Sequence, residues 1–265
     1  MYLVATPIGN LEDITYRAVR TLKEVDLIAC EDTRHTRRLL DHYGISKPTI
    51  SYHEHNETGR AESLIARIVA GANVAIVSDA GTPLICDPGY RIVNAAVDAG
   101  IRVIPIPGPS AILTALTASG LPTDSFYFGG FVSQKQSARR KTFETLSELD
   151  CTLVFYEAPH RVVETLQDIA EIYGEREIVV TRELTKLHEE FLRGTAMEIL
   201  KSITPKGEMT IVIGKPVKVA DDRPVREVFD NFIIQGMSRM DAIKAVAKAR
   251  GVSKREIYAA LETLE

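Results

Sequence analysis

Short apolar runs alternate with amphipathic stretches over the first part of the chain. Strands are predicted over residues 2–5, 26–30, 74–77 and 102–106, and helices over 13–24, 33–43, 62–70 and 90–99. Most of these helices end just before a glycine, which suits the left-handed backbone of a helix end. Apolar strands separated by helices are typical of a mostly parallel sheet covered on both faces. We therefore predict an α/β domain over residues 1–118.

The pattern breaks at residues 119–125, where Gly120, Pro122 and Asp124 lie close together. Beyond this hinge, strands are predicted over 126–129, 152–156, 177–181, 189–193 and 209–213, and helices over 161–173 and 198–203. Strands that follow each other with little between them indicate a mixed, partly antiparallel sheet. We therefore predict a second α/β domain over residues 119–219.

The last segment, residues 220–265, is predicted to be a polar linker (220–224) followed only by helices. Those helices cover residues 225–235, 238–249 and the stretch after Ser253, where Ser253 and Glu256 have the spacing of a capping box. A small residue, a glycine and an aliphatic residue have the spacing of a helix-turn-helix unit: Ala247, Gly251 and Ile257. From Ser238 to Tyr258, six basic residues stand against two acidic ones. This excess suits contact with phosphate, and the alternative is a helical cap that packs on the rest of the protein.

Composition narrows the choice of partners. The chain has 265 residues, is 45% hydrophobic and carries a net charge of −4, so nucleic acid would have to be bound by local patches. Its three cysteines are odd in number and widely spaced, which favours reduced thiols. No leader opens the chain, and no apolar run approaches the ~20 residues of a membrane helix. We expect a soluble, cytoplasmic protein.

Three polar turns each follow a predicted strand: Thr6–Asn10, Ser78–Pro83 and Pro107–Ala111. Turns of this kind line the ligand crevice of open α/β sheets. None has the glycine-lysine pattern of a phosphate-binding loop, and the first turn lacks the dinucleotide fingerprint. Backbone, small side chains and the carboxylate of Asp79 indicate one cleft for a phosphate-free ligand such as a nucleoside. The alternative role of Asp79 is to cap a turn.

Charged segments follow other predicted strands. Glu31 and Asp32 precede a helix that carries Arg34, Arg37 and Arg38, which directs charge to the same crevice unless Asp32 only caps the helix. Residues 53–57 hold histidine and carboxylate groups, but too few ligands are evident for zinc, so we predict a polar loop and no metal site.

The predicted second domain adds three charged segments. Residues 130–141 read as a basic loop with Phe131 as a stacking face, or as a plain surface loop. Residues 157–161 end a strand and are placed to close the cleft. Residues 182–190 mix charges, and Lys186 in that segment would act as a proton acceptor only if burial lowered its pKa.

Taken together, these segments resemble the tetrapyrrole methylase superfamily, whose members are S-adenosylmethionine-dependent methyltransferases with two α/β domains around a cleft. The resemblance covers nearly the whole chain and rests on residues 4–11, 31–34, 78–83, 107–111 and 155–161. It is closest to a branch that methylates the ribose 2′-oxygen of a cytidine in 16S ribosomal RNA of the small subunit.

The resemblance implies S-adenosylmethionine as cofactor and a homodimer. It implies cofactor contacts at Pro7, Asp79, Ala80, Gly81, Thr82, Pro83, Ser110, Ala111, Tyr156, Glu157, Ala158, Pro205 and Gly207. It gives no secure proton acceptor, and the candidates are Glu31, Asp32, Glu183 and Lys186, of which we favour the Glu31/Asp32 pair. Contacts with RNA are expected from Arg34, Arg37, Lys135, Arg139, Arg140 and Lys141, with the tail as a further candidate.

Two other functions stay open at this point. One is methylation of a corrin or porphyrin precursor, against which the single glycine of the first turn and the basic tail argue. The other is a non-catalytic RNA-binding assembly factor. Against that reading, the second and third turns retain Asp79, Gly81, Pro109 and Ser110.

Overall fold

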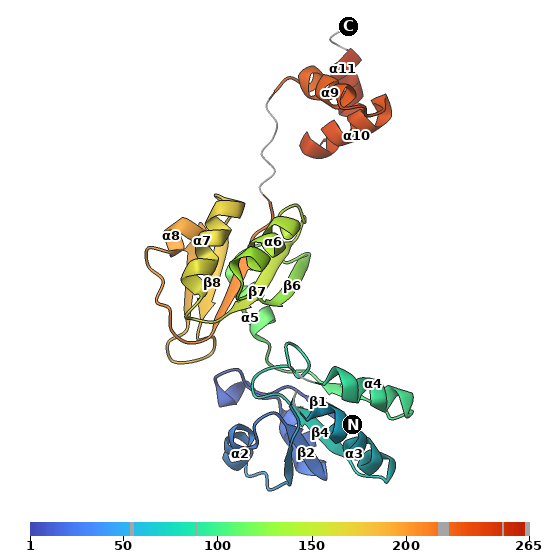
Figure 1. Cartoon of the computed structure of the whole chain (residues 1–265), viewed down its shortest axis with the longest axis vertical. Coiled ribbons are helices and arrows are strands. Elements are labelled where there is room, and N and C mark those ends of the chain that lie inside the picture. Colours follow the sequence, from blue (N-terminus) through green and yellow to red (C-terminus); the bar gives the residue numbers. More distant parts are fainter. Residues whose placement is uncertain (54–55, 88, 217–222, 251, 263–265) are drawn as a thin grey trace. The chain divides into compact units, whose positions relative to one another are not determined.

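The structure, a computed structural model, describes residues 1–53, 56–87, 89–216, 223–250 and 252–262. The chain divides into two compact units, Met1–Lys215 and Pro216–Glu265 (Figure 1). The first unit contains two five-stranded sheets. The domain boundary predicted at residues 118/119 falls inside this unit and stays a prediction.

The first sheet is entirely parallel, with strand order β3-β2-β4-β1-β5. Its strands are β1 (Tyr2–Val4), β2 (Leu27–Cys30), β3 (Thr49–Ser51), β4 (Val74–Val77) and β5 (Ile104–Ile106). The connecting helices are η1 (Leu11–Asp13), α1 (Tyr16–Glu24), α2 (Thr33–His42), α3 (Glu57–Val69) and α4 (Tyr90–Asp98). The side chains of β2 and β4 are buried on both faces, since alternate residues join two separate apolar clusters. This confirms the predicted α/β pattern.

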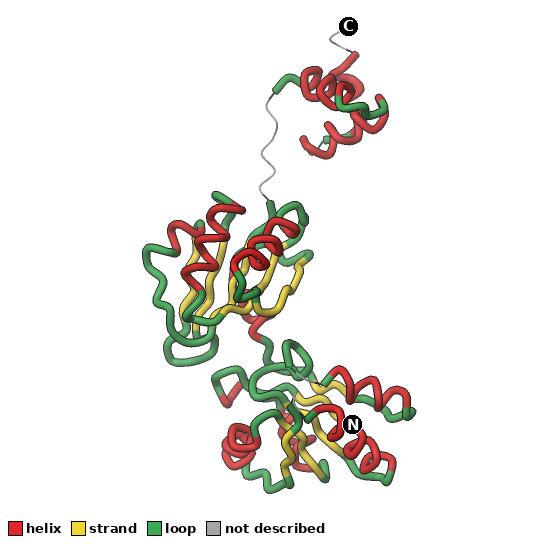
Figure 2. Tube along the Cα trace, viewed as in Figure 1, coloured by secondary structure: helices red, strands yellow, loops and turns green. Residues whose placement is uncertain are grey.

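The second sheet has the order β6-β7-β10-β8-β9, in which β6 and β7 are parallel and the other pairs antiparallel. Figure 2 shows the strands of both sheets in yellow with helices in red beside them. Its strands are β6 (Phe126–Phe131), β7 (Thr152–Glu157), β8 (Ile178–Arg182), β9 (Glu190–Gly194) and β10 (Met209–Ile213). Helices α6 (Gln136–Leu146), α7 (Val162–Tyr173) and α8 (Ala196–Ile199) cover one face, and α5 (Ala111–Ser119) covers the other. The mixed sheet that the sequence predicts is confirmed.

The main difference from the predicted elements is that residues 136–146 form a helix, α6, where a basic loop was expected. Phe143 and Leu146 from this helix are buried in the core of the second sheet, and so is Arg139. Arg139 occupies a core-facing position of this helix, so the apolar periodicity that would have predicted a helix is interrupted there. Helix α3 also begins five residues earlier than predicted, at Glu57 rather than residue 62.

The second unit contains α9 (Val225–Ile234), α10 (Arg239–Arg250) and α11 (Lys254–Glu262), which share one apolar core. The predicted cap at Ser253 is present, since its Oγ accepts from the N–H of Glu256 (3.3 Å). Ser238 caps α10 in the same way, since its Oγ accepts from the N–H of Asp241 (3.2 Å). Gly251 and most of the linker predicted at 220–224 lie outside the described residues. Within the described ranges, no helix is long and apolar enough to cross a membrane.

Candidate functional site

The three polar turns lie side by side at the carboxyl edge of the first sheet. This follows from the strand order, because β1 lies between β4 and β5. Thr6 and Gly81 join the first two turns through two backbone hydrogen bonds of 2.9 and 3.0 Å. Thr82 Oγ1 donates to the carbonyl oxygen of Pro109 (3.1 Å), which joins the second turn to the third. The convergence expected from the sequence is therefore present.

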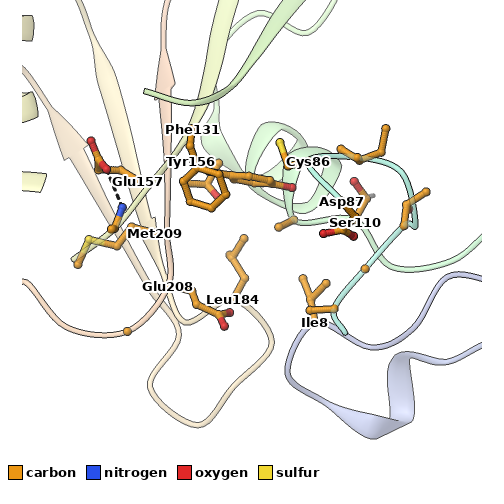
Figure 3. Close-up of a pocket in the computed structure, with 18 of the residues that line it drawn as sticks. Ile8, Cys86, Asp87, Ser110, Phe131, Tyr156, Glu157, Leu184, Glu208 and Met209 are labelled. Carbon is orange, nitrogen blue, oxygen red and sulfur yellow. Dashed lines mark hydrogen bonds between the residues drawn. The ribbon is translucent and has the colours of Figure 1, made fainter. Parts of the chain in front are cut away.

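A first cavity of about 380 Å³ lies between these turns and the second sheet. The turns and the loop after β4 contribute Ile8, Ala80, Gly81, Thr82, Ile85, Cys86, Asp87, Ser110 and Ala111. The second sheet and its loops contribute Phe131, Tyr156, Glu157, Ala158, Pro159, Leu184, Gly207, Glu208, Met209 and Thr210. Figure 3 shows Phe131 and Tyr156 projecting toward Cys86 and Asp87, with ring centroids of the two aromatic side chains 5.4 Å apart. Apolar side chains dominate its walls.

The predicted cofactor residues divide between two places. Those that line the first cavity are Ala80, Gly81, Thr82, Ser110, Ala111, Tyr156, Glu157, Ala158 and Gly207. Pro7 and Asp79 line a second cavity instead, and Pro83 and Pro205 line neither. Sequence reasoning missed Ile85, Cys86 and Asp87, although they follow the second turn directly, because only the turn itself had a recognisable pattern.

Glu157 lines the first cavity but its carboxylate is occupied within the protein. It accepts hydrogen bonds from the N–H of Ala158 (2.7 Å), from Arg161 Nη2 (2.8 Å) and from the hydroxyl of Thr165. The side chain is almost fully buried. Glu157 therefore fixes the turn after β7, and that turn, rather than the carboxylate, forms the wall of the cavity.

Carboxylates gather where β2 and β4 end. Ser78 Oγ donates a hydrogen bond to Asp87, which by itself would lower the pKa of Asp87. Burial and the nearby charge of Asp79 outweigh this hydrogen bond and raise that pKa. Burial, then the charges of Asp79 and Asp87, raises the pKa of Glu31. Asp79 accepts a hydrogen bond from the N–H of Asp32 (3.2 Å). Within the described ranges, no group of three histidine, cysteine or acidic residues could hold a metal ion.

The favoured proton-acceptor pair is not placed at either cavity. Asp32 caps α2 by accepting from the N–H of Arg34 (2.8 Å) and from its guanidinium, which holds the pKa of Asp32 at about 2. Glu31 is exposed and lines neither cavity. The alternative reading of Asp32 as a helix cap is therefore the one that the structure supports.

The second cavity, also of about 380 Å³, lies beside the first and is lined by acidic and basic side chains. It is lined by Thr6, Pro7, Ile8, Gly9, Leu11, His35, Thr36, Arg38, Leu39, Ser78, Asp79, Ala80, Lys186 and Glu208. Helical spacing decides which basic side chains of α2 reach it: His35 and Arg38, three residues apart, share the lining face with Leu39. Arg34 and Arg37, which the sequence singled out for RNA, lie on other faces, and Arg34 pairs with Asp32 (2.8 Å).

Lys186 lines the second cavity but is not a base at neutral pH, contrary to one expectation. Its Nζ donates to Glu183 Oε1 (2.9 Å) and Glu208 Oε2 (3.1 Å). Burial opposes its charge, but these two carboxylates outweigh burial and raise the pKa of Lys186. The condition for Lys186 to accept a proton, a lowered pKa, is not met.

The predicted basic RNA segment is corrected in part. Arg139 is buried, and its Nε donates to Asp168 Oδ2 (2.6 Å), so it is unavailable to RNA. Arg140 pairs with the same carboxylate (3.1 Å) and with Glu171. Lys135 and Lys141 are exposed. Only these two lysines of the segment keep the expected role as free surface cations.

The comparisons with known proteins agree with this geometry. A family model described as Tetrapyrrole (Corrin/Porphyrin) Methylases matches residues 1–200. The chain therefore belongs to the tetrapyrrole methylase family, as its motifs predicted. Solved structures share the fold. A diphthine synthase has a TM-score of 0.62 at 14% sequence identity, and the match covers 80% of this chain and 88% of that one. The methyltransferase CobJ has a TM-score of 0.61 at 19% identity, and the match covers 81% of this chain and 93% of that one. A uroporphyrin-III C-methyltransferase from Thermus thermophilus, complexed with S-adenosylhomocysteine, has a TM-score of 0.57 at 19% identity, and the match covers 82% of this chain and 98% of that one.

Curated relatives are more similar in sequence and share one name, ribosomal RNA small subunit methyltransferase I. The protein from Halalkalibacterium halodurans is 49% identical and covers 97% of this chain and 93% of its own length. The protein from Bacillus subtilis is 46% identical, and the match covers 97% of this chain and 92% of that protein. The protein from Mesorhizobium japonicum is 48% identical, and the match covers 100% of this chain and 92% of that protein. The similarity extends over the helical second unit as well as the two sheets.

Proposed function

We propose that this protein is an S-adenosylmethionine-dependent methyltransferase of ribosomal RNA in the small subunit, and that it methylates the ribose 2′-hydroxyl of a cytidine. The observation that carries the proposal is a cavity with apolar and aromatic walls at the carboxyl edge of a parallel sheet, directly beside a second, charged cavity. The names of the relatives support RNA as the substrate.

The residues of the first cavity fit the cofactor. Its volume of about 380 Å³ falls within the range of small-molecule pockets, about 300–1,000 Å³. Tyr156 and Phe131 offer aromatic faces for the adenine, and the carboxylate of Asp87 suits a ligand with cationic groups. Gly81 has φ of +83°, and a Cβ there would lie 3.2 Å from Ile8 Cγ2, so only glycine gives this wall its shape without strain.

The chain's own contribution to the reaction is placement. When bound, S-adenosylmethionine supplies an activated methyl group, so most of the rate must come from holding the acceptor oxygen in line with it. The three turns and the turn after β7 are each fixed by internal hydrogen bonds, which makes the first cavity rigid. A target base inside folded RNA would have to leave its stack to reach the acceptor side.

Parts of the proposal rest on the family resemblance. A homodimer is one of them, and a cytoplasmic location is another, since an enzyme of this kind must meet the small ribosomal subunit. Contacts with the RNA backbone are proposed for Arg37, Lys135 and Lys141, all of which are exposed. The basic residues of the helical unit would add to these contacts.

The proposal is tested with methyl-labelled S-adenosylmethionine and small ribosomal particles that lack the modification, with the label mapped to nucleotide and atom. Label on a ribose 2′-oxygen of a cytidine is the expected result. A protein that binds S-adenosylhomocysteine but labels neither particles nor free RNA would contradict it. A uroporphyrin-type precursor is then the next substrate to assay.

A further inference from the structure

The two cavities meet at a shared wall. Among the residues that the structure describes, only Ile8, Ala80 and Glu208 line both cavities. Glu208 is the only one of these three with a titratable side chain. A group that acts between a ligand in one cavity and a ligand in the other has to lie on this wall, and Glu208 lies there. Figure 3 shows its carboxylate beside Leu184, across from Ile8.

Backbone hydrogen bonds fix the position of Glu208. It precedes β10 and lies opposite Glu183, which follows β8: the N–H of Glu183 donates to the carbonyl oxygen of Glu208 (2.9 Å). The N–H of Glu208 in turn donates to Glu183 Oε1 (2.9 Å). These contacts extend the β8–β10 ladder by one residue toward the cavities, so Glu208 stands on the end of a sheet rather than on a mobile loop.

Lys186 fixes the side chain of Glu208. Its Nζ bridges the carboxylates of Glu183 and Glu208, and its stem is packed against the first turn. A Cβ on Gly9 would lie only 2.4 Å from Lys186 Cγ, so the glycine is what lets the lysine pass there. The Glu208 side chain nevertheless stays 72% exposed, and its carboxylate is accessible to a ligand.

The rest of the second cavity suits a nucleotide. Arg38 and His35 on one face of α2 can bind a phosphate, and Asp79 adds a carboxylate. Among the described residues, the first cavity is lined by carboxylates but by no lysine, arginine or histidine. The positive charge of Arg38 therefore assigns a phosphate-bearing ligand to the second cavity.

We propose that the second cavity takes the acceptor nucleotide, and that Glu208 accepts the proton of its ribose hydroxyl while Lys186 positions Glu208. This inference rests on the proposed function. In the transfer, the hydroxyl oxygen forms a bond to the methyl carbon, the carbon–sulfur bond breaks with its electron pair on sulfur, and the hydroxyl proton passes to Glu208 and then to water. Arg38 holds the phosphate of the acceptor nucleotide.

The decisive variant is Glu208→Gln, which keeps the shape of the side chain. Methyl transfer to particles should fall by about 10²–10⁴-fold, the range for loss of a general base. The affinity for S-adenosylhomocysteine, measured by calorimetry, should stay within about twofold. Glu24→Gln is the matched control, because the Glu24 side chain is exposed on α1 and lines neither cavity.

Two further variants separate positioning and binding from chemistry. Lys186→Met should slow methyl transfer about tenfold to a hundredfold, and Lys186→Arg should restore most of it, because either cation can hold Glu208. Arg38→Gln should weaken binding of cytidine 5′-monophosphate, measured by ligand-observed NMR with S-adenosylhomocysteine present, about tenfold or more. Arg20→Gln, on α1, is the matched arginine control.

The outcomes distinguish this inference from the proposed function. A wild-type protein that labels no RNA contradicts the proposed function and the role of Glu208 with it. A wild-type protein that labels RNA while Glu208→Gln does so at more than a third of its rate overturns the role of Glu208 alone. Unchanged binding of cytidine 5′-monophosphate in Arg38→Gln overturns the assignment of the second cavity, whatever the rates.

Discussion

The two cavities have the same volume, about 380 Å³, but among the described residues only the second is lined by basic side chains. The second sheet lines the first cavity with Tyr156, Phe131 and Met209, whereas helix α2 lines the second with His35 and Arg38. One turn serves both, since Ser78 and Asp79 face the second cavity and Gly81 and Thr82 the first. Two adjoining sites of different chemistry can therefore be built from one strand end, provided that different elements cover them.

The largest effect on turnover is expected at the shared wall, at Glu208, as described above. The largest effect on stability is expected away from both cavities, in Asp168→Asn. Asp168 and Arg139 are both about 1% exposed, and breaking a buried ion pair costs about 3–5 kcal/mol. Chemical denaturation should show this loss, while the binding of both ligands by the folded variant should not change. If Asp168→Asn lost RNA binding but kept its stability, Arg139 would have to be assigned a contact with RNA.

The same pair predicts a pH dependence of stability. Burial alone would raise the pKa of Asp168, but hydrogen bonds from Arg139, Gln136 and Arg140 outweigh it and lower the pKa. A lowered pKa in the folded state means that the stabilisation is present above the unfolded value, about 3.9, and is lost as the pH falls through the folded value. Denaturation curves of the wild type should show this acid loss, and those of Asp168→Asn should show less of it.

A change on the aromatic side should separate the two cavities. Tyr156→Ala removes a ring from the first cavity, and loss of a stacking partner costs about 1–3 kcal/mol per base. We expect the affinity for S-adenosylhomocysteine to fall about tenfold to a hundredfold and the affinity for cytidine 5′-monophosphate to stay the same. Calorimetry and ligand-observed NMR measure the two. Equal losses for both ligands would mean that the cavities act as one site.

Asp87→Asn tests the electrostatics of the first cavity. The pKa of Asp87 is raised above 3.8, chiefly by burial, so its negative charge develops only as the pH rises through that raised value. Affinity of the wild type for the cationic S-adenosylmethionine should therefore increase with pH over this range. In Asp87→Asn the increase should shrink, and affinity at neutral pH should fall about tenfold. A variant with the same pH dependence as the wild type would assign the effect to another group.

The smallest effect is expected on the surface outside both cavities. Lys141→Gln removes one exposed cation, and each lost phosphate contact reduces the slope of log K against log salt by about 1. Filter binding of ribosomal RNA at several salt concentrations measures this slope. Lys23→Gln, on α1, serves as the control. An unchanged slope in Lys141→Gln would mean that Lys141, in the segment after β6, makes no contact with an RNA phosphate.

The sequence by itself determined the parallel first sheet, the mixed second sheet and the three turns, because each depends on local periodicity and on glycine or proline at fixed places. It also predicted the family, since several motifs occur in order along one chain. Nine of the 19 described residues that line the first cavity were predicted as cofactor contacts from the family resemblance. The loop with Cys86 and Asp87 did not, because it has no recognisable pattern of its own.

Only the tertiary structure decided which charges are available. Arg139, Arg140, Arg34 and Asp32 look like surface charges in the sequence, yet each is paired, and Arg139 is buried as well. Conversely, Glu208 had no motif, and its place on the shared wall results from strand pairing between segments far apart in the chain. Local patterns specify backbone structure, whereas the partner of a charge depends on which distant segment packs against it.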